Sequence, residues 1–265
     1  MRRIIGITFG LATQALFLFT VWYLFSFLKG NYSQRNYGSL WIDAALALQF
    51  AVPHSLLLLP TTRRRLARWI PSAFYGCFFC VATCLGLLLT FAFWRGSPVE
   101  LWRFHGWIRI GIESAFIGSW VALFYSLSLT GLGYQTGLTP WWQWVRGRSG
   151  PRSPFEPHGV YHWFRHPIYL CFLGLLWFTP VMTLDRAVLI GLLTVYIFVG
   201  SYLKDERLAF YNGESYRRYQ SLVVGYPLVF FGPLGKRPLF TSQSDSRDTR
   251  HSPVPRREQP ERRAA

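Results

Sequence analysis

Charged residues are scarce in this chain of 265 residues. Only 15% of the residues are Asp, Glu, Lys or Arg, whereas soluble domains carry about 25%. The deficit argues against an ordinary soluble domain. Hydrophobic residues instead make up 51% of the chain, and aromatic residues make up 18%. This composition predicts an integral membrane protein, in which aromatic side chains suit the lipid-facing surface and the two water interfaces.

Acidic residues are the scarcest charged type, with 12 Asp and Glu against 28 Lys and Arg, giving a formal net charge of +16. In a soluble chain this excess would indicate nucleic acid. Here the arginines cluster in short loops and in a polar tail, which fits contact with anionic lipid head groups. No nucleic-acid-binding module accompanies them. We therefore expect membrane lipids as partners and no nucleic acid.

Cysteine is also rare, with four residues. Cys77, Cys80 and Cys84 are spaced to share one helix face inside an apolar run. A redox or metal site needs a polar, reachable thiolate, but Phe and Leu surround these three. The spacing therefore favours helix packing, and no disulfide framework is indicated.

Long apolar runs provide the material for transmembrane helices, each of which needs about 20 residues. Six spans are predicted: Ile4–Leu28, Leu40–Leu59, Ile70–Trp94, Ile108–Leu129, Ile168–Thr183 and Ala187–Leu203. The first run is too long for a signal peptide and lacks a cleavage site, so we expect it to be retained. The last two are separated by Leu184–Arg186 and predict a tight helical hairpin. The expected fold is an all-α, polytopic membrane bundle.

The loop arginines indicate the orientation of the bundle. Placing the N-terminus in the cytoplasm puts most of them on that side: Arg2, Arg3, Arg63, Arg64, Arg65, Arg68, Arg146, Arg148, Arg152 and Arg165. Both termini are then cytoplasmic, in a membrane that we expect to be the bacterial inner membrane. From Thr241 to Ala265 the chain is rich in Ser, Pro, Arg and Glu, which predicts a disordered basic tail after a transmembrane domain over residues 1–240.

Chemically reactive residues concentrate in Glu156–Tyr169, directly before the hairpin. Pro157 and Pro167 disfavour helix in the residues before them, and Pro167 suits the first turn of the next helix. The free amides of that helix start would favour a carboxylate. A second polar run, Lys204–Tyr219, follows the hairpin and must emerge on the same side. One pocket would then have a basic and an acidic wall.

Two other interpretations of these segments have to be weighed on composition alone. Basic and aromatic residues at a membrane surface commonly anchor helices to head groups. His158, His162 and His166 are spaced by four residues and invite a metal interpretation. However, the prolines disfavour a regular helix, and no carboxylate or Cys set completes a ligand group. We therefore predict no metal site.

The order of these motifs resembles a known group of enzymes. The chain contains, in this order, Gly159-x-Tyr161-x-x-x-Arg165-His166-Pro167-x-Tyr169, a hairpin, an acidic pair, Leu208, Gly213-x-x-Tyr216 and Tyr219. The set resembles the membrane methyltransferase superfamily, which includes isoprenylcysteine carboxyl methyltransferases and phospholipid methyltransferases. It is most similar to the methanethiol S-methyltransferase branch, which is related to the NnrU proteins.

Three further stretches support that branch. They are Asp43 followed by the run from Leu48 to Ser55, Gly131-Leu132-Gly133-Tyr134-Gln135, and Thr179-Pro180-x-Met182-Thr183, which resembles a hairpin turn. The resemblance covers about residues 40–228. It departs from the family where Lys204-Asp205 replaces the usual Glu-Glu, where Cys171 replaces Gly, and where Asn212 replaces Phe.

The resemblance implies that S-adenosylmethionine is the cofactor. It assigns cofactor binding to Gly159, Tyr161, Arg165, His166, Pro167, Tyr169, Asp205 and Glu206. Arg165 and His166 would hold a carboxylate through charge-assisted hydrogen bonds. Asp205 or Glu206 would accept from hydroxyl or amino groups, and tyrosine rings would face the sulfonium or the adenine.

Methyl transfer depends on alignment of donor and acceptor, and a thiol reacts as the thiolate. His54 and His166 are the candidate catalytic bases. The expected activity is S-methylation of a small thiol, of the methanethiol to dimethyl sulfide type. Two alternatives remain: methylation of a prenylcysteine carboxylate or phospholipid, and a non-enzymatic NnrU-like membrane protein. The oligomeric state is not predicted.

Overall fold

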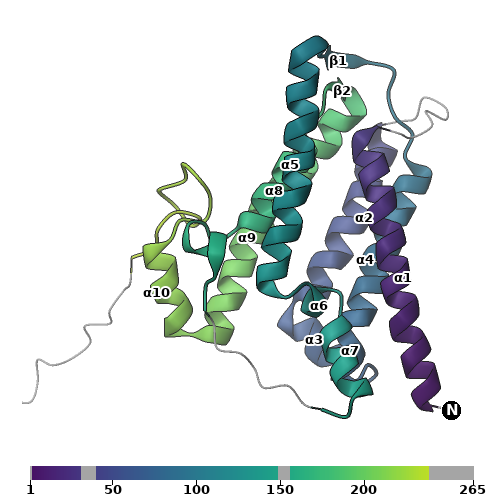
Figure 1. Cartoon of the computed structure of the whole chain (residues 1–265), viewed down its shortest axis with the longest axis vertical. Helices are drawn as coiled ribbons and strands as arrows, with labels where there is room; N and C mark the ends of the chain where they lie inside the picture. Colours follow the sequence, from purple (N-terminus) through teal and green to yellow (C-terminus); the bar gives the residue numbers. More distant parts are fainter. Residues whose placement is uncertain (1, 31–39, 149–155, 239–265) are drawn as a thin grey trace, which may run out of the picture.

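Five long apolar helices form the body of the molecule. The computed structural model describes residues 2–30, 40–148 and 156–238. The long helices are α1 Arg2–Lys29, α2 Leu40–Leu58, α4 Ser72–Phe93, α5 Gly106–Thr130 and α9 Leu184–Asn212. Each is long and apolar enough to cross a membrane, and Figure 1 shows them running side by side. The prediction of an all-α, multi-pass membrane bundle is confirmed.

Short helices join and flank these five. They are α3 Pro60–Leu66, α6 Leu132–Gln135, α7 Leu138–Val145, the 3-10 helix η1 Gly159–His162, α8 Pro167–Trp177 and α10 Glu214–Leu222. The sequence sets their ends. Pro60 and Pro167 occupy the first turns of α3 and α8, where the missing amide has no partner to lose. Gly131 ends α5 with a left-handed φ of 76°, which glycine adopts without steric cost.

The predicted hairpin is wrong in its boundaries. The span Ile168–Thr183 is in fact the shorter helix α8, whose 11 residues rise only about 16 Å, roughly half of a bilayer core. The turn does not lie at Leu184–Arg186, which form the first turn of α9. It lies at residues 178–183, so the Thr-Pro-x-Met-Thr stretch does form the turn.

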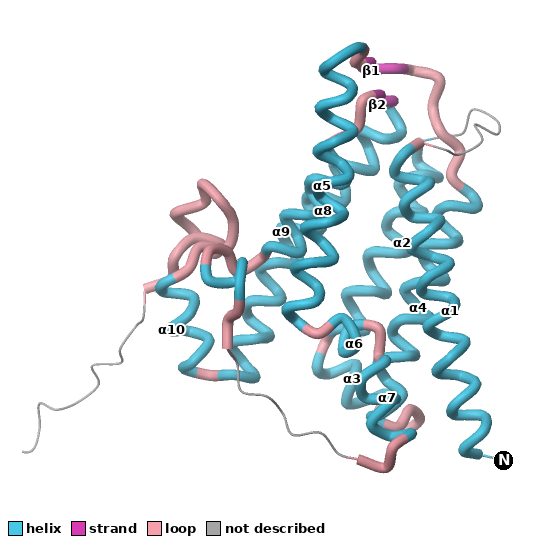
Figure 2. Tube along the Cα trace, in the orientation of Figure 1, coloured by secondary structure: helices cyan, strands magenta, loops and turns pink. Residues whose placement is uncertain are grey.

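A small antiparallel ladder, which the sequence does not predict, closes this end of the bundle. Strand β1 Glu100–Arg103 pairs with β2 Val181–Thr183. The ladder ties the loop before α5 to the turn after α8, as Figure 2 shows. All four residues of β1 are exposed, so the ladder lies at the surface of this end of the bundle.

Buried side chains at the same end explain the displaced turn. Asp185 accepts hydrogen bonds from Trp94 Nε1 at 2.9 Å and from the Ser97 amide at 3.0 Å. Arg186 donates to the carbonyls of Phe27 and Leu28. From the sequence these charged residues were predicted to form a loop. Tertiary hydrogen bonds instead hold them inside the fold, so α9 begins before the predicted start at Ala187.

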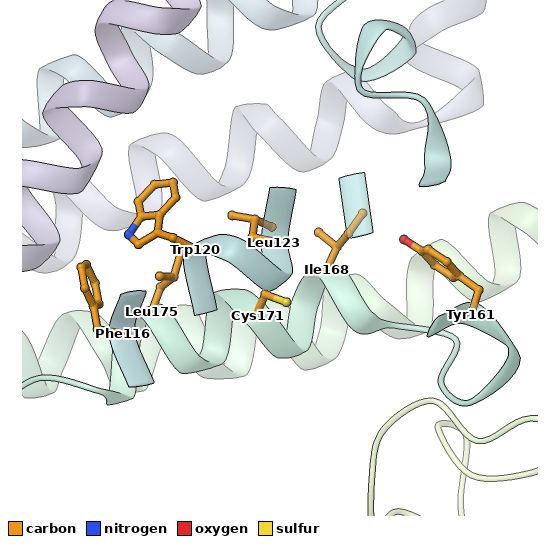
Figure 3. Packing of buried hydrophobic residues seen from close by; sticks show 7 residues of the cluster. All are labelled: Phe116, Trp120, Leu123, Tyr161, Ile168, Cys171 and Leu175. Atoms are coloured by element: carbon orange, nitrogen blue, oxygen red, sulfur yellow. The ribbon is translucent and has the colours of Figure 1, made fainter. Parts of the chain in front are cut away.

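The core facing the candidate site lies between α5 and α8. Its members are Phe116, Trp120, Leu123, Tyr161, Ile168, Cys171 and Leu175. Figure 3 shows them along α5 and α8, with Tyr161 contributed by η1 before α8. Elsewhere α1 packs on α4, where Cys77, Cys80 and Cys84 are buried and unbridged, as expected for a packing role. Burying these side chains fixes α8 against α5 and therefore fixes the segment that enters α8.

Exposed tryptophans mark the two ends of the bundle. Trp41 and Trp107 lie in the first turns of α2 and α5 and are 84% and 87% exposed, and Trp69 precedes α4 at 85%. Such placement is typical of side chains at the membrane–water interface.

Figure 1 places the N-terminus, α3 and α7 at the end opposite the β1–β2 ladder. Arg63, Arg64 and Arg65 of α3 lie there, and Arg3 Nη2 donates to the Val145 carbonyl at 3.0 Å. Arg152 and the tail from Thr241 to Ala265 lie outside the described residues.

Candidate functional site

The entry to α8 is held beside a returning segment of the C-terminal region. The Arg165 amide donates to the Val224 carbonyl at 2.9 Å, and the His166 amide donates to the Gly225 carbonyl at 3.1 Å. Pro167 then begins α8. Because the backbone at Arg165 and His166 is paired on one side, their side chains are directed to the neighbouring α9.

Arg165 and Asp205 form an ion pair that is buried on both sides. Arg165 Nη2 lies 2.9 Å from Asp205 Oδ2, and neither side chain is exposed. Arg165 Nη1 also donates to three carbonyls, those of Gln220, Val223 and Gly235, at 2.8–3.0 Å. The guanidinium therefore joins α8, α9, α10 and the C-terminal loop. The predicted basic and acidic walls are in direct contact with each other.

His166 completes the buried cluster. Its Nε2 lies 3.3 Å from Asp205 Oδ1, which also accepts from the Tyr216 hydroxyl. The ring packs against Tyr169 and Tyr226. Burial lowers the pKa of His166 from its ordinary value, although the Asp205 carboxylate acts in the opposite direction. His166 is therefore held neutral near pH 7, the form that can exchange a proton.

Gly159 and Tyr161 line the side of the cluster that faces α5. The Tyr161 carbonyl accepts from the Tyr219 hydroxyl, and burial raises the pKa of Tyr161. Gly159 has a φ of +55°, and a Cβ there would lie 2.8 Å from Leu129 Cδ1 and 2.9 Å from the Tyr125 hydroxyl. Glycine is thus required for close packing on α5, independently of any ligand.

Glu206 does not join the cluster. Its carboxylate pairs with Arg237 on the exposed surface, whereas its neighbour Asp205 is fully buried. Successive helical residues differ by about 100° around the axis, so only one of the two can face α8. The structure brings Asp205 to Arg165 and His166, and it places Glu206 outside.

A second group of polar residues lies on another face of α9. Lys204 Nζ stands 5.1 Å from the centre of the Tyr169 ring, and Arg207 Nη1 donates to the Leu58 carbonyl at the end of α2. Ser55 of α2 donates to the hydroxyl of Tyr196. Tyr169 touches both groups, because its ring also packs on His166.

His54 belongs to this second group, and its hydrogen bond defines its tautomer. Its Nδ1 lies 3.3 Å from Thr83 Oγ1, but the single proton of Thr83 is donated to the Phe79 carbonyl at 2.8 Å. With Thr83 donating there, Nδ1 is assigned as the donor and Nε2 as the unprotonated nitrogen. The ring lies 6.4 Å from that of Tyr196. His54 can therefore accept a proton at Nε2.

Several buried polar atoms in the first cluster lack a partner. Among the described residues, the donors Arg165 Nε and Gln220 Nε2 are buried without a hydrogen bond, and so is His166 Nδ1, which is an acceptor when Nε2 donates to Asp205. Buried polar groups are nearly always satisfied, so these donors fit a ligand that carries hydroxyl, carboxylate or ring-nitrogen acceptors. S-adenosylmethionine, the cofactor that the resemblance implies, carries all three kinds of acceptor.

Sequence reasoning missed part of this cluster. Tyr216 and Tyr219 stood in the recognised motif without a role, and Gln220 and Tyr226 had no sequence signal. They reach the site because the chain after α10 folds back on α8. His158 and His162 are exposed, and no group of three His, Cys, Asp or Glu suited to a metal occurs in the described part of the chain.

Comparison with known proteins confirms the resemblance to the methanethiol S-methyltransferase branch. Methanethiol S-methyltransferase of a Pseudomonas species is 28% identical over 235 residues, covering 83% of this chain and 89% of that protein. Methanethiol S-methyltransferase 1 of Bradyrhizobium diazoefficiens is 26% identical, with 83% and 81% covered. Nurim of Rattus norvegicus is 25% identical, with 69% and 73% covered. No family model and no solved structure matches the chain.

Proposed function

We propose that this protein is an integral-membrane methyltransferase that uses S-adenosylmethionine to S-methylate a small thiol such as methanethiol. Its relatives of that name match more than four fifths of the chain. The observation that carries the proposal is the convergence of the two segments to which the resemblance assigns cofactor binding. They meet within 2.9–3.3 Å at Arg165, His166 and Asp205.

The residues of the first cluster divide the binding task between them. When bound, S-adenosylmethionine supplies an electrophilic methyl group on a sulfonium sulfur. Asp205 and His166 would hold its polar end, and Gln220 offers a further donor. Arg165 orients Asp205 and joins the surrounding elements. Glu206, in its exposed pair with Arg237, is a weaker candidate than Asp205.

The location of the cluster suits two different substrates. We place the end of the bundle that contains α3 and α7 in the cytoplasm, from which a charged cofactor must come. A small apolar thiol would enter from the lipid beside α8, which has fewer than half as many residues as α5 or α9. His54 and His166 remain the proposed bases.

A methylation assay tests the function. Membranes containing the protein are incubated with isotope-labelled S-adenosylmethionine and methanethiol, and the headspace is analysed for labelled dimethyl sulfide. We expect product above that of membranes from cells with an empty vector. Label recovered only in extracted lipid would refute the small-thiol acceptor, and label in neither fraction would refute methyl transfer to both.

A further inference from the structure

Helix α9 carries two cations whose role the cofactor cluster does not explain. Lys204 and Arg207 flank Asp205 in sequence but face away from it, toward Tyr169 and the end of α2. Lys204 stands where the recognised family usually has a glutamate. The sequence therefore departs from the family that it resembles at a residue adjacent to the site.

Neither cation forms an ion pair within the described part of the chain. The Lys204 ammonium contacts the Tyr169 ring, and Arg207 donates to a backbone carbonyl. Asp205 acts electrostatically on Lys204, but its carboxylate is directed to Arg165, His166 and Tyr216 and forms no ion pair with Lys204. Both side chains are half-buried. Two cations on an apolar wall without a counter-charge are costly, so the arrangement favours an anion.

The surroundings suit a small anion with apolar character. Arg207 also interacts electrostatically with Tyr169 and with His54. Side chains of α2, α8 and α9 therefore lie near one another here. The Tyr196 hydroxyl accepts from Ser55, which leaves its own proton to donate. The titratable and charged groups that face Lys204 and Arg207 are Tyr169 of α8, Asp205 and Tyr196 of α9, and His54 of α2.

We propose that Lys204 and Arg207 form an anion site that holds the methyl acceptor as a thiolate, an inference that rests on the proposed function. The thiolate is the nucleophilic form of a thiol, and nearby cations favour it. The S–H bond breaks with its electron pair left on sulfur, and the proton passes to His54 Nε2 and then to water. That electron pair forms the new S–C bond, while the bond between the methyl carbon and the sulfonium sulfur breaks.

Charge also decides between the acceptor and the cofactor as the occupant. Two cations would repel the sulfonium of S-adenosylmethionine but attract a thiolate that approaches it. The assigned cofactor segments meet on the Asp205 face of α9, whereas Lys204 and Arg207 lie on the other. The Tyr169 ring contacts both Lys204 and His166, so the thiolate and the sulfonium methyl would meet at the edge of this ring.

Thiocyanate serves as the probe because it is a stable small anion with a terminal sulfur. Its binding to detergent-purified protein is measured by NMR line broadening of the labelled anion. We expect the wild type and Lys204→Arg to bind it, and Lys204→Gln to lose at least about tenfold in affinity. The control is Lys236→Gln, which neutralises an exposed lysine and is expected to bind normally. The pH at half-maximal methylation should rise by about one unit in Lys204→Gln, since the thiolate is less favoured.

The outcomes separate this inference from the proposed function. Unchanged thiocyanate affinity in folded Lys204→Gln would overturn the inference. A loss of S-adenosylhomocysteine binding in that variant, with thiocyanate binding intact, would assign the cations to the cofactor and overturn it as well. Thiocyanate binding that depends on Lys204, in a wild type that methylates no thiol, would support the anion site and refute the proposed function.

Discussion

At the scale of single residues, the central feature is a buried ion pair of one positive and one negative side chain. Arg165 and Asp205 are both fully buried and neutralise each other. Removing one partner of a buried pair leaves an uncompensated charge and costs about 3–5 kcal/mol. Arg165 also anchors three carbonyls, so its loss would disturb the fold before it reports on ligand binding. Substitution of Asp205 by its isosteric amide is the gentler probe.

The buried His166 should make the folded protein less stable in acid. Burial lowers its pKa in the folded state, while the unfolded chain binds a proton below about pH 6.5. Above that value both states are neutral and His166 contributes no pH dependence. Below it the unfolded state binds more protons, so stability falls with pH. We expect the melting temperature in detergent to drop from about pH 7 to about pH 5.5, and to drop less in His166→Asn. Equal drops in both proteins would contradict the assignment.

At the scale of elements, η1 depends on one glycine. Gly159 combines a φ of +55° with close contact to α5. Gly159→Ala should destabilise the protein by about 1–3 kcal/mol, because a left-handed alanine is strained and its methyl group clashes. Thermal melting in detergent measures the effect. Gly191→Ala is the matched control, since nothing lies within 4 Å of that position in α9. A Gly159→Ala melting temperature equal to that of the control would refute the packing role.

The elements show which parts of the fold the sequence could predict. Runs of apolar residues predicted α1, α2, α4 and α5 closely, because a bilayer admits few alternatives to a helix. The turn before α9 was misplaced, because Asp185 and Arg186 look like loop residues unless their buried partners are known. The β1–β2 ladder pairs segments about 80 residues apart, and no local pattern encodes such a pairing.

The candidate site was predictable to a similar extent. The hairpin brings the segment before α8 and the acidic residues of α9 to one side, which placed Arg165 near Asp205. Helix phase could also have separated Asp205 from Glu206, because Asp205 is in register with Ser201 and Ala209, which are buried too. The return of residues 223–235 over the site depends on tertiary contacts alone. Tyr226 therefore could not be foreseen.

At the scale of the whole molecule, the orientation of the bundle remains a prediction. The basic end with α3 and α7 should face the cytoplasm, and the β1–β2 ladder should face the opposite side. In intact cells, a membrane-impermeant maleimide should label His105→Cys, and it should label Arg148→Cys only after permeabilisation. The four native cysteines are buried, so the background should be low. The reverse pattern would invert the topology and place the proposed cofactor site on the wrong side.

Calorimetric titration of S-adenosylhomocysteine into purified protein tests whether the cofactor binds at Asp205. Wild type, Asp205→Asn and Glu206→Gln are compared, since the two variants neutralise adjacent carboxylates of which only Asp205 faces Arg165 and His166. We predict equal binding by the wild type and Glu206→Gln, and at least about tenfold weaker binding by Asp205→Asn, or about 1.4 kcal/mol. Undiminished binding by a folded Asp205→Asn protein would show that Asp205 does not hold the cofactor.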